Sequence, residues 1–345
     1  MIDFTINNRK VGPNHPPLVL AECGINHEGS IDKAYQMIDS AIEAGAEAIK
    51  FQCHITDKEM IETNMKPGEI SSERLWDIIK RCELTENEEL ELFRYCQSKN
   101  IIYLSTPFSR EASDRLDSMG VPAFKIGSGE CNNYPLIEHI SKKRKPIILS
   151  TGMNDIASIR KSVSIIEKYK CPLILLHCTS MYPTPYEKVR LGAITDLSKN
   201  FNNIPIGLSD HSIGIATCLG AVALGATVLE KHFTVTREWP GPDVPISIEP
   251  GELKRLITDS KIIWQSLGGR KTILDDEKPV IDFAYASVVS IRNIKKGDIF
   301  SLENIWVKRP GNGELLSDQL ENILGKISLS DIPVNTQLCN SDIKK

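Results

Sequence analysis

The sequence lacks the features that mark membrane, secreted and nucleic-acid-binding proteins. It has no apolar run near the ~18 residues that a membrane helix needs. Its first residues, MIDFTINNRKVGPNHPP, contain no apolar core of a secretory signal. A net charge of −4 without a basic stripe argues against binding to nucleic acid. We therefore expect a cytoplasmic protein that binds neither membranes nor nucleic acid.

Paired cysteines are also missing. The nine cysteines include no C-x-x-C pair, which disfavours a structural zinc site or a disulfide framework. An odd number of thiols without pattern is typical of a reducing compartment. We interpret most of them as small buried apolar side chains.

What the sequence does contain is an alternation of short apolar runs with helix-type patterns. The helix pattern that follows the first run has Ser30 as its expected N-cap and Gly45 near its end. Eight β/α units in order predict a (β/α)8 TIM barrel over residues 1–270. The eight expected strands are residues 17–24, 46–54, 101–108, 121–129, 145–152, 172–180, 204–211 and 227–234.

The two ends of the chain show other patterns. Residues 4–12, FTINNRKVG, predict a hairpin that would plug the lower end of the barrel. Residues 271–283 carry charges instead of a periodic pattern and are interpreted as a linker. In residues 284–345, short strands broken by Gly, Pro and Asn predict a small β-rich domain.

The last apolar run, TVLEKHFT, ends in three ionisable residues, of which Glu230 and His232 share a face with Val228. The other runs also turn polar at their ends. Burying such groups unpaired costs ~1–3 kcal/mol each, and TIM-barrel sites lie at the carboxyl ends of the strands. The pattern therefore predicts a site at these strand ends, which carry Glu22, Lys50, Gln52, Ser105, Thr106, Lys125, Ser128, Glu130, Ser150, His177, Thr179, Ser180, Ser209, Asp210, His211, Glu230 and His232.

Two lysines and four hydroxyl groups in this set favour an anion. Lys50 and Lys125 would converge on it, and the hydroxyl groups would complete a phosphate cradle. A single lysine at a strand end more often forms a surface ion pair. Together with the four hydroxyl groups, the two lysines predict a site for phosphate or a phosphate ester. The hydroxyl groups belong to Thr106, Ser128, Ser150 and Ser209.

Two histidines predict an open metal site. His211 and His232 end neighbouring runs and both face inward by alternation, with Glu22 expected across the mouth. The alternative is that each imidazole only forms a hydrogen bond in a polar core. Asp210 points the other way and would orient a ligand from behind.

Ordered motifs across the whole chain resemble the sialic acid synthase (N-acetylneuraminate synthase) family. The motifs are AECGINHEGS, STPFSREA, KIGSGECNNYPLI, ILSTGMN, LLHCTSMYPTPYE, GLSDHS, EKHFT and PGPD. The tail ASVVSIRNIKKGDIFSLENIWVKRPGNG is similar to the antifreeze-like (SAF) domain of that family.

The resemblance implies condensation of phosphoenolpyruvate with N-acetylmannosamine and water, with phosphate released by C–O cleavage. It implies Mn²⁺ or Mg²⁺ on His211 and His232, and a domain-swapped homodimer. Glu22, Lys50, Lys125 and Glu130 would be catalytic. Phosphoenolpyruvate would bind Lys50, Thr106, Lys125, Ser128, Ser150, Ser180 and Ser209. The sugar would contact Gln52, Glu69, Glu130, Tyr182, Asp243, Phe283 and Arg309.

Departures from the family pattern leave alternatives open. Glu69, Ser180, Trp239 and Phe51 differ from common family residues and are expected around the sugar. A second acceptor is therefore a 2,4-diacetamido-trideoxymannose, giving N,N'-diacetyllegionaminate. A Schiff-base aldolase using Lys125 or Lys50 is another hypothesis. A non-enzymatic tail that binds ice or polysaccharide is a third.

Overall fold

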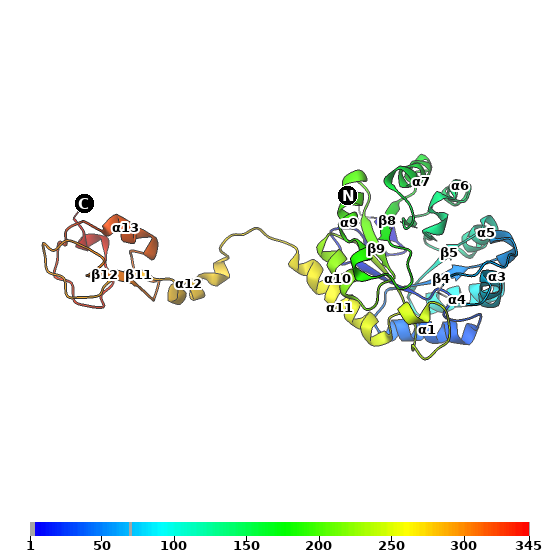
Figure 1. Ribbon diagram of the computed structural model, residues 1–345, viewed down its shortest axis with the longest axis horizontal. Helices are drawn as coiled ribbons and strands as arrows, with labels where there is room; N and C mark the ends of the chain where they lie inside the picture. Colours follow the sequence, from blue (N-terminus) through cyan, green and yellow to red (C-terminus); the bar gives the residue numbers. More distant parts are fainter. Residues whose placement is uncertain (1–3, 69–70, 345) are drawn as a thin grey trace. The chain divides into compact units, whose positions relative to one another are not determined.

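A computed structural model describes residues 4–68 and 71–344 of the chain (Figure 1). The chain divides into two compact units, Met1–Gly268 and Gly269–Lys345. Glu69, expected near the sugar, lies outside the described residues.

The first unit contains eight parallel strands arranged as a TIM-type barrel, as the eight apolar runs predict (Figure 1). The hydrogen-bonded order is β5-β4-β3-β10-β9-β8-β7-β6, and β5 and β6 lie side by side where the sheet closes. Such strands are covered on both faces, which explains their nearly continuous apolar sequences. The strands are β3 (Leu18–Glu22), β4 (Ala48–Cys53), β5 (Ile102–Pro107), β6 (Phe124–Ile126), β7 (Ile147–Ser150), β8 (Leu173–Cys178), β9 (Ile206–Asp210) and β10 (Val228–His232).

Helices follow the strands and cover the outside of the barrel (Figure 1). The first begins as the sequence predicts, because the Ser30 hydroxyl accepts a hydrogen bond from the Lys33 N–H, and Gly45 follows its end at φ +90°. The helices are α1 (Ile31–Glu43), α2 (Thr56–Glu59), α3 (Leu75–Cys82), α4 (Glu86–Ser98), α5 (Arg110–Met119), α6 (Tyr134–Ser141), α7 (Ile156–Lys168), α8 (Tyr186–Val189), α9 (Gly192–Asn200), α10 (Ala216–Ala223) and α11 (Pro250–Ser266). Short 3₁₀ turns cover Gly129–Asn132 and Val244–Ile246.

The lower end of the barrel is closed by the predicted hairpin. Strands β1 (Phe4–Ile6) and β2 (Arg9–Val11) pair antiparallel, with Ile6 opposite Arg9. Ile6 and Val11 are fully buried and join the apolar cluster that fills the barrel interior. That cluster also contains Leu18, Leu20, Ala48, Ile102, Leu104, Ala123, Ile148, Ile174, Leu176 and Val228. The hairpin thus excludes water from below, under the polar strand ends.

The second unit has a small apolar core of its own, formed by Val288, Ile294, Phe300, Ile305, Leu315, Ile323, Ile332, Leu338 and Ile343. Its elements are α12 (Lys278–Ala284), β11 (Ser287–Ser290), β12 (Ile305–Lys308) and α13 (Leu320–Ile323), with 3₁₀ turns at Asp275–Glu277, Ser317–Gln319 and Asn340–Asp342. β11 and β12 pair antiparallel. Part of the segment expected as a linker is therefore helical, because Pro279 occupies a first-turn position and Lys278 pairs with Asp282 one turn later.

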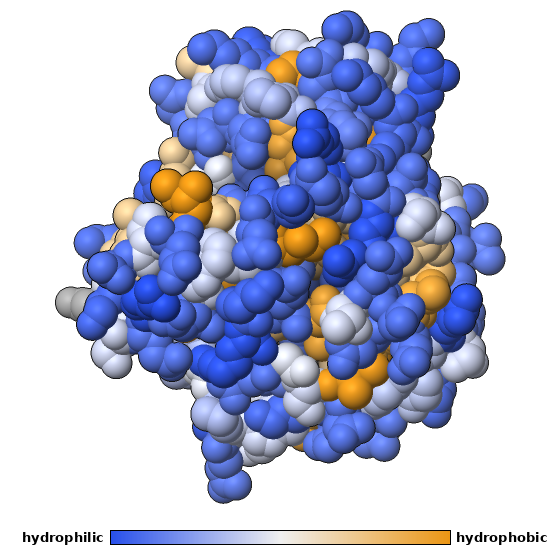
Figure 2. Space-filling view, turned by 90° about the vertical axis from the view of Figure 1, so that its right-hand side faces the viewer, coloured by the Kyte–Doolittle hydropathy of each residue, from blue (hydrophilic) through white to orange (hydrophobic). Residues whose placement is uncertain are grey.

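The molecular surface in Figure 2 is dominated by hydrophilic side chains, with hydrophobic ones in small separate spots. No helix within residues 4–68 and 71–344 is long and apolar enough to cross a membrane. All nine cysteines are free thiols, and eight of them are buried, as their lack of pattern predicts.

Candidate active site

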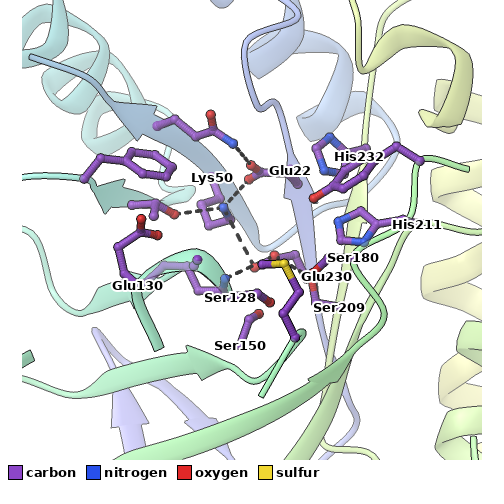
Figure 3. A pocket seen from close by; sticks show the side chains of 18 residues that line it. Glu22, Lys50, Ser128, Glu130, Ser150, Ser180, Ser209, His211, Glu230 and His232 are labelled. Carbon is purple, nitrogen blue, oxygen red and sulfur yellow. Dashed lines mark hydrogen bonds and ion pairs between the residues drawn. The ribbon is translucent and has the colours of Figure 1, made fainter. Parts of the chain in front are cut away.

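The polar strand ends line one cavity of about 330 Å³ at the carboxyl end of the barrel (Figure 3). Thirteen of the predicted site residues line it: Glu22, Lys50, Gln52, Thr106, Lys125, Ser128, Glu130, Ser150, Ser180, Tyr182, Ser209, His211 and His232. Glu230, also expected at a strand end, completes the wall with four residues that were not predicted: Phe108, Gly127, Gly129 and Met153. Four other residues from the expected strand ends do not line this cavity: Ser105, His177, Thr179 and Asp210. Asp243 lies next to it, whereas Phe283 and Arg309 are exposed in the second unit.

Two buried lysines and two buried carboxylates form the centre of the cavity (Figure 3). Lys50 Nζ lies 2.6 Å from Glu22 Oε2 and 3.9 Å from Glu230 Oε2, and it donates to Thr106 Oγ1 at 3.0 Å. Lys125 Nζ lies 3.4 Å from Glu230 Oε1. The carboxylates hold both ammonium groups at fixed positions away from water, where their electrostatic effect on a ligand is strongest.

Burial and ion pairing shift the pKa values of this cluster in opposite directions. Burial raises the pKa of Glu22 to about 7, against the attraction of Lys50. Burial also lowers the pKa of Lys125, although Glu230 counteracts it. For Glu230, the nearby Lys125 and Lys50 outweigh burial and lower the pKa. Glu230 is therefore the fixed counter-charge, and Glu22 is the carboxyl group closest to giving or taking a proton near neutral pH.

The sequence places Glu230 among the polar strand ends but indicates no individual role for it. The alternation along TVLEKHFT already placed it on the inner face beside His232, and the structure pairs it with both lysines. The two lysines were expected to meet an incoming anion only. A counter-charge could have been inferred, because unpaired charges buried away from water are very costly.

The serine hydroxyl groups surround a tightly packed stretch of backbone. Gly152 N–H donates to Ser128 Oγ at 3.0 Å. A Cβ on Gly152 would lie 2.5 Å from Ser180 Oγ and 2.8 Å from Ser128 Oγ, so only glycine fits. Ser209 Oγ donates to Glu230 Oε1 at 3.0 Å. Ser150 Oγ is buried and has no hydrogen-bond partner in the described chain, so it is free to bind a ligand that enters the cavity.

The two predicted metal-binding histidines lie together. β9 and β10 are neighbours, and the ring centroids of His211 and His232 are 5.3 Å apart. His211 Nδ1 faces the Thr179 carbonyl at 3.1 Å, so Nδ1 carries the proton and Nε2 keeps its lone pair. His232 Nδ1 is buried without a hydrogen-bond partner in the described chain. Burial and the neighbouring His211 hold the pKa of His232 well below its usual value, so the ring is neutral.

These features fit a divalent ion held by two imidazoles, with the other positions filled by substrate or water. Within residues 4–68 and 71–344, no three His, Cys, Asp or Glu side chains are grouped as a complete metal site. Glu22, expected across the mouth, is instead engaged by Lys50 and by Gln52 Nε2, which donates to Glu22 Oε1 at 3.1 Å.

A buried ion pair lies behind the two histidines. Asp210 Oδ2 is 2.7 Å from Lys231 Nζ and accepts hydrogen bonds from Ser212 and Thr217, each at 2.9 Å. As the alternation predicts, Asp210 thus points away from the cavity. The pair ties the end of β9 to the end of β10 and holds the two imidazoles in register.

The predicted sugar residues lie around the histidines. The Tyr182 ring is 4.1 Å from the His211 ring, and Asp243 Oδ2 is 3.7 Å from His232 Nδ1. Burial raises the pKa of both Glu130 and Asp243. A second cavity of about 170 Å³ adjoins this end of the site, lined by Gln52, Tyr182, His232 and Asp243 and by the apolar residues Ile25, Pro67, Leu75, Ile78, Ile79 and Pro242.

Two departures from the family pattern do not lie where they were expected. Phe51 is buried on the outer face of β4 and stacks on Tyr103, because alternation turns it away from Lys50 and Gln52. Trp239 packs under Lys33 and does not line the cavity. Ser180 does line it. His27 accepts a hydrogen bond from the Gly29 N–H of its own loop, so its visible role is structural.

The fold and this site define an enzyme, and comparison with known proteins identifies its family. Residues 37–272 match the NeuB family and residues 285–344 match the SAF domain. The chain belongs to the NeuB family of sugar acid synthases.

Named relatives cover nearly the whole chain. The chain is 39% identical over 321 residues to the N,N'-diacetyllegionaminic acid synthase of Campylobacter jejuni, covering 90% of this chain and 95% of the relative. It is 34% identical over 326 residues to the N-acetylneuraminate-9-phosphate synthase of Homo sapiens, covering 92% and 90%. These relatives are named for different sugar acids, so the family alone does not specify the sugar.

A solved structure is also similar. It is an N-acetylneuraminic acid (sialic acid) synthetase from Leptospira borgpetersenii, with a TM-score of 0.74 and 38% identity. The similarity covers 81% of this chain and 95% of that one.

Proposed function

We propose that the protein condenses phosphoenolpyruvate with an N-acetylmannosamine-type sugar and water, and releases phosphate and a nine-carbon 2-keto acid. The observation that carries this proposal is the anion cradle. Two buried ammonium groups and the Ser150 hydroxyl, which has no partner in the described chain, line the same cavity. A phosphate ester with a carboxylate satisfies these donors, and an apolar ligand does not.

In the proposed reaction, C3 of phosphoenolpyruvate attacks the aldehyde carbon of the open-chain sugar and forms the new C–C bond. Water adds to the cationic C2, and the resulting tetrahedral carbon expels phosphate by C–O cleavage. Lys50 and Lys125 stabilise the negative charge of the ester and of the leaving phosphate. Glu22 and Glu130 are the carboxyl groups positioned to move the proton of the added water.

A divalent ion, Mn²⁺ or Mg²⁺, would be held by His211 and His232, and when bound it polarises the aldehyde carbonyl as a Lewis acid. The protein's contribution is to hold the two imidazoles side by side at the ends of β9 and β10. The pKa of His211 is raised, because Cys178 and the Thr179 carbonyl outweigh burial, so a metal ion would compete with a proton at this ring. Burial keeps His232 deprotonated, and the Thr179 carbonyl fixes the tautomer of His211.

N-acetylmannosamine, which would give N-acetylneuraminate, is the first candidate acceptor. A 2,4-diacetamido-trideoxymannose is the second, and the adjoining apolar cavity supports it. Its 6-methyl group and second acetamido methyl group would bury against Leu75, Ile78 and Ile79, where a hydroxyl group would lose its hydrogen bonds.

The function is tested by phosphate release from phosphoenolpyruvate with each of the two sugars, followed by mass spectrometry of the product. Water labelled with ¹⁸O should place the label in the keto acid and not in phosphate, because the C–O bond breaks. Label in phosphate would contradict the proposed reaction. Trapping of a pyruvate–lysine adduct by borohydride would support the Schiff-base aldolase instead.

We also propose that a second copy of the chain completes the site as a domain-swapped homodimer, with Arg309 and Phe283 contacting the sugar. Both side chains are exposed in the second unit. Arg309→Ala should raise the KM of the sugar about ten-fold or more, because one hydrogen bond from a charged group is lost. The KM of phosphoenolpyruvate should change little. Arg292→Ala, which removes another exposed arginine of this unit, is the control. An unchanged sugar KM would contradict the contact.

A further inference from the structure

A buried chain of hydrogen bonds leads from Glu22 away from the cavity. Gln52 Nε2 donates to Glu22 Oε1 at 3.1 Å, and Gln52 Oε1 lies 2.9 Å from His54 Nε2. His54 Nδ1 lies 3.0 Å from each oxygen of the Glu59 carboxylate. The side chains of His54 and Glu59 are each 4% exposed, so water does not satisfy these groups.

The partners in this chain determine where each proton lies. When ionised, Glu22 is paired with Lys50 at 2.6 Å and is only an acceptor, so in this state it fixes the NH₂ group of the Gln52 amide toward itself. The amide oxygen of Gln52 then faces His54 Nε2 and requires an N–H there. The Glu59 carboxylate requires a second N–H at Nδ1. In this arrangement both ring nitrogens of His54 face acceptors, which calls for a donor at each of them.

The surroundings of His54 suit a positive charge. Phe108 stacks on the imidazole with a centroid distance of 4.4 Å and an interplanar angle of 12°. Besides Glu59 of α2, the carboxyl groups of Glu89, Glu130 and Asp243 interact with it electrostatically. The nearby His27 does not add a competing charge, because burial lowers its pKa to about 4.

We propose that His54, held doubly protonated by Glu59, is a positioning residue that fixes the Gln52 amide and, through it, the Glu22 carboxylate. If the Nε2–H is lost, the amide is free to turn its oxygen toward Glu22, where two acceptors repel. Glu22 then loses a donor and its fixed orientation in the cavity. The role of Glu22 in the reaction rests on the proposed function. The first test, which measures only the protonation of His54, does not depend on that function.

The first test is the protonation of His54 in the full chain, measured by ¹⁵N NMR of protein labelled at its seven histidines. His54→Gln identifies the His54 signals by their loss. We expect both ring nitrogens of His54 to be protonated at pH 7.5 in the wild-type protein. A ring with one unprotonated nitrogen would overturn the proposal, even if phosphate release is normal. Conversely, absence of phosphate release would refute the proposed function while the NMR result still stands.

The second test is a pair of kinetic variants. Glu59→Gln keeps an acceptor for Nδ1 but removes the charge that stabilises the imidazolium. Its kcat should therefore fall about 10–100-fold at pH 8 and recover as the pH is lowered, so that the alkaline limb of the profile moves to lower pH. The KM of phosphoenolpyruvate should change less than about two-fold, because the lysine cradle is untouched. Glu111→Gln, which changes a partly exposed carboxylate on α5, is the control.

His54 itself separates positioning from packing. His54→Leu keeps an apolar contact with Phe108 but has no donor, and its kcat should fall about 10–100-fold at every pH. His54→Gln offers an N–H to Gln52 and should recover part of that loss. Equal activity of the two variants, or a Glu59→Gln profile parallel to that of the wild type, would show that the chain acts only in packing.

Discussion

Lys50→Met should reduce kcat/KM for phosphoenolpyruvate about 10³-fold or more, the largest effect that we expect from a single change in the anion cradle. The Lys50 ammonium lies between Glu22 and Glu230 and also donates to Thr106. Without it, the two buried carboxylates face each other with less counter-charge, and the pKa of Glu22 rises further because its nearest cation is gone. The variant therefore loses two features at once, the Lys50 donor to the phosphate ester and the ionised form of Glu22.

The measurement is the initial rate of phosphate release against phosphoenolpyruvate concentration, with circular dichroism as the check of folding. Lys261→Met, on the exposed face of α11, is the matched control and should leave the rate unchanged. A folded Lys50→Met variant that retains more than about a tenth of wild-type kcat/KM would contradict the assignment of Lys50 to the cradle.

His232→Ala should abolish both Mn²⁺ binding and turnover, with a loss of at least about 100-fold in each. With only two protein imidazoles available, removal of one leaves a single ligand, which cannot hold a divalent ion against water. Chelation of the wild-type protein should likewise stop turnover, and added Mn²⁺ should restore it.

Metal binding is measured directly by electron paramagnetic resonance titration of Mn²⁺, so the result does not depend on activity. His139→Ala is the control, since this partly exposed histidine pairs with Asp114 on the outside of the barrel. Normal Mn²⁺ affinity in His232→Ala would refute the role of this residue as a ligand. Full turnover after thorough chelation would refute the metal requirement itself.

The fold was predictable because its signals are local and repeated. Each barrel strand is a short apolar run. The polar residues at the run ends gather at one end of the barrel, because all eight strands are parallel and their carboxyl ends meet there. Alternation along a strand sufficed to place His211 and His232 inward and Asp210 outward.

What the sequence did not reveal depends on contacts between distant segments. The pairing of Glu230 with Lys50 and Lys125 joins three strands, so no single motif contains it. The orientation of Gln52 depends on Glu22 on one side and His54 on the other, residues 30 and 2 positions away. Part of the expected linker is helical because of a local pair, Lys278 with Asp282, which no periodic apolar pattern accompanies.

The N-terminal hairpin has a consequence for catalysis although none of its residues lines the cavity. Ile6 and Val11 belong to the same apolar cluster as Leu18, Leu20 and Val228 at the lower end of the barrel. From there, β3 continues to Glu22 and β10 continues to Glu230. If the packing of this hairpin is loosened, water can enter along the barrel axis toward Lys50 and Lys125. The higher dielectric constant would then weaken the attraction between these lysines and a bound anion. A substitution in the N-terminal hairpin would thus weaken anion binding at the opposite, carboxyl end of the barrel.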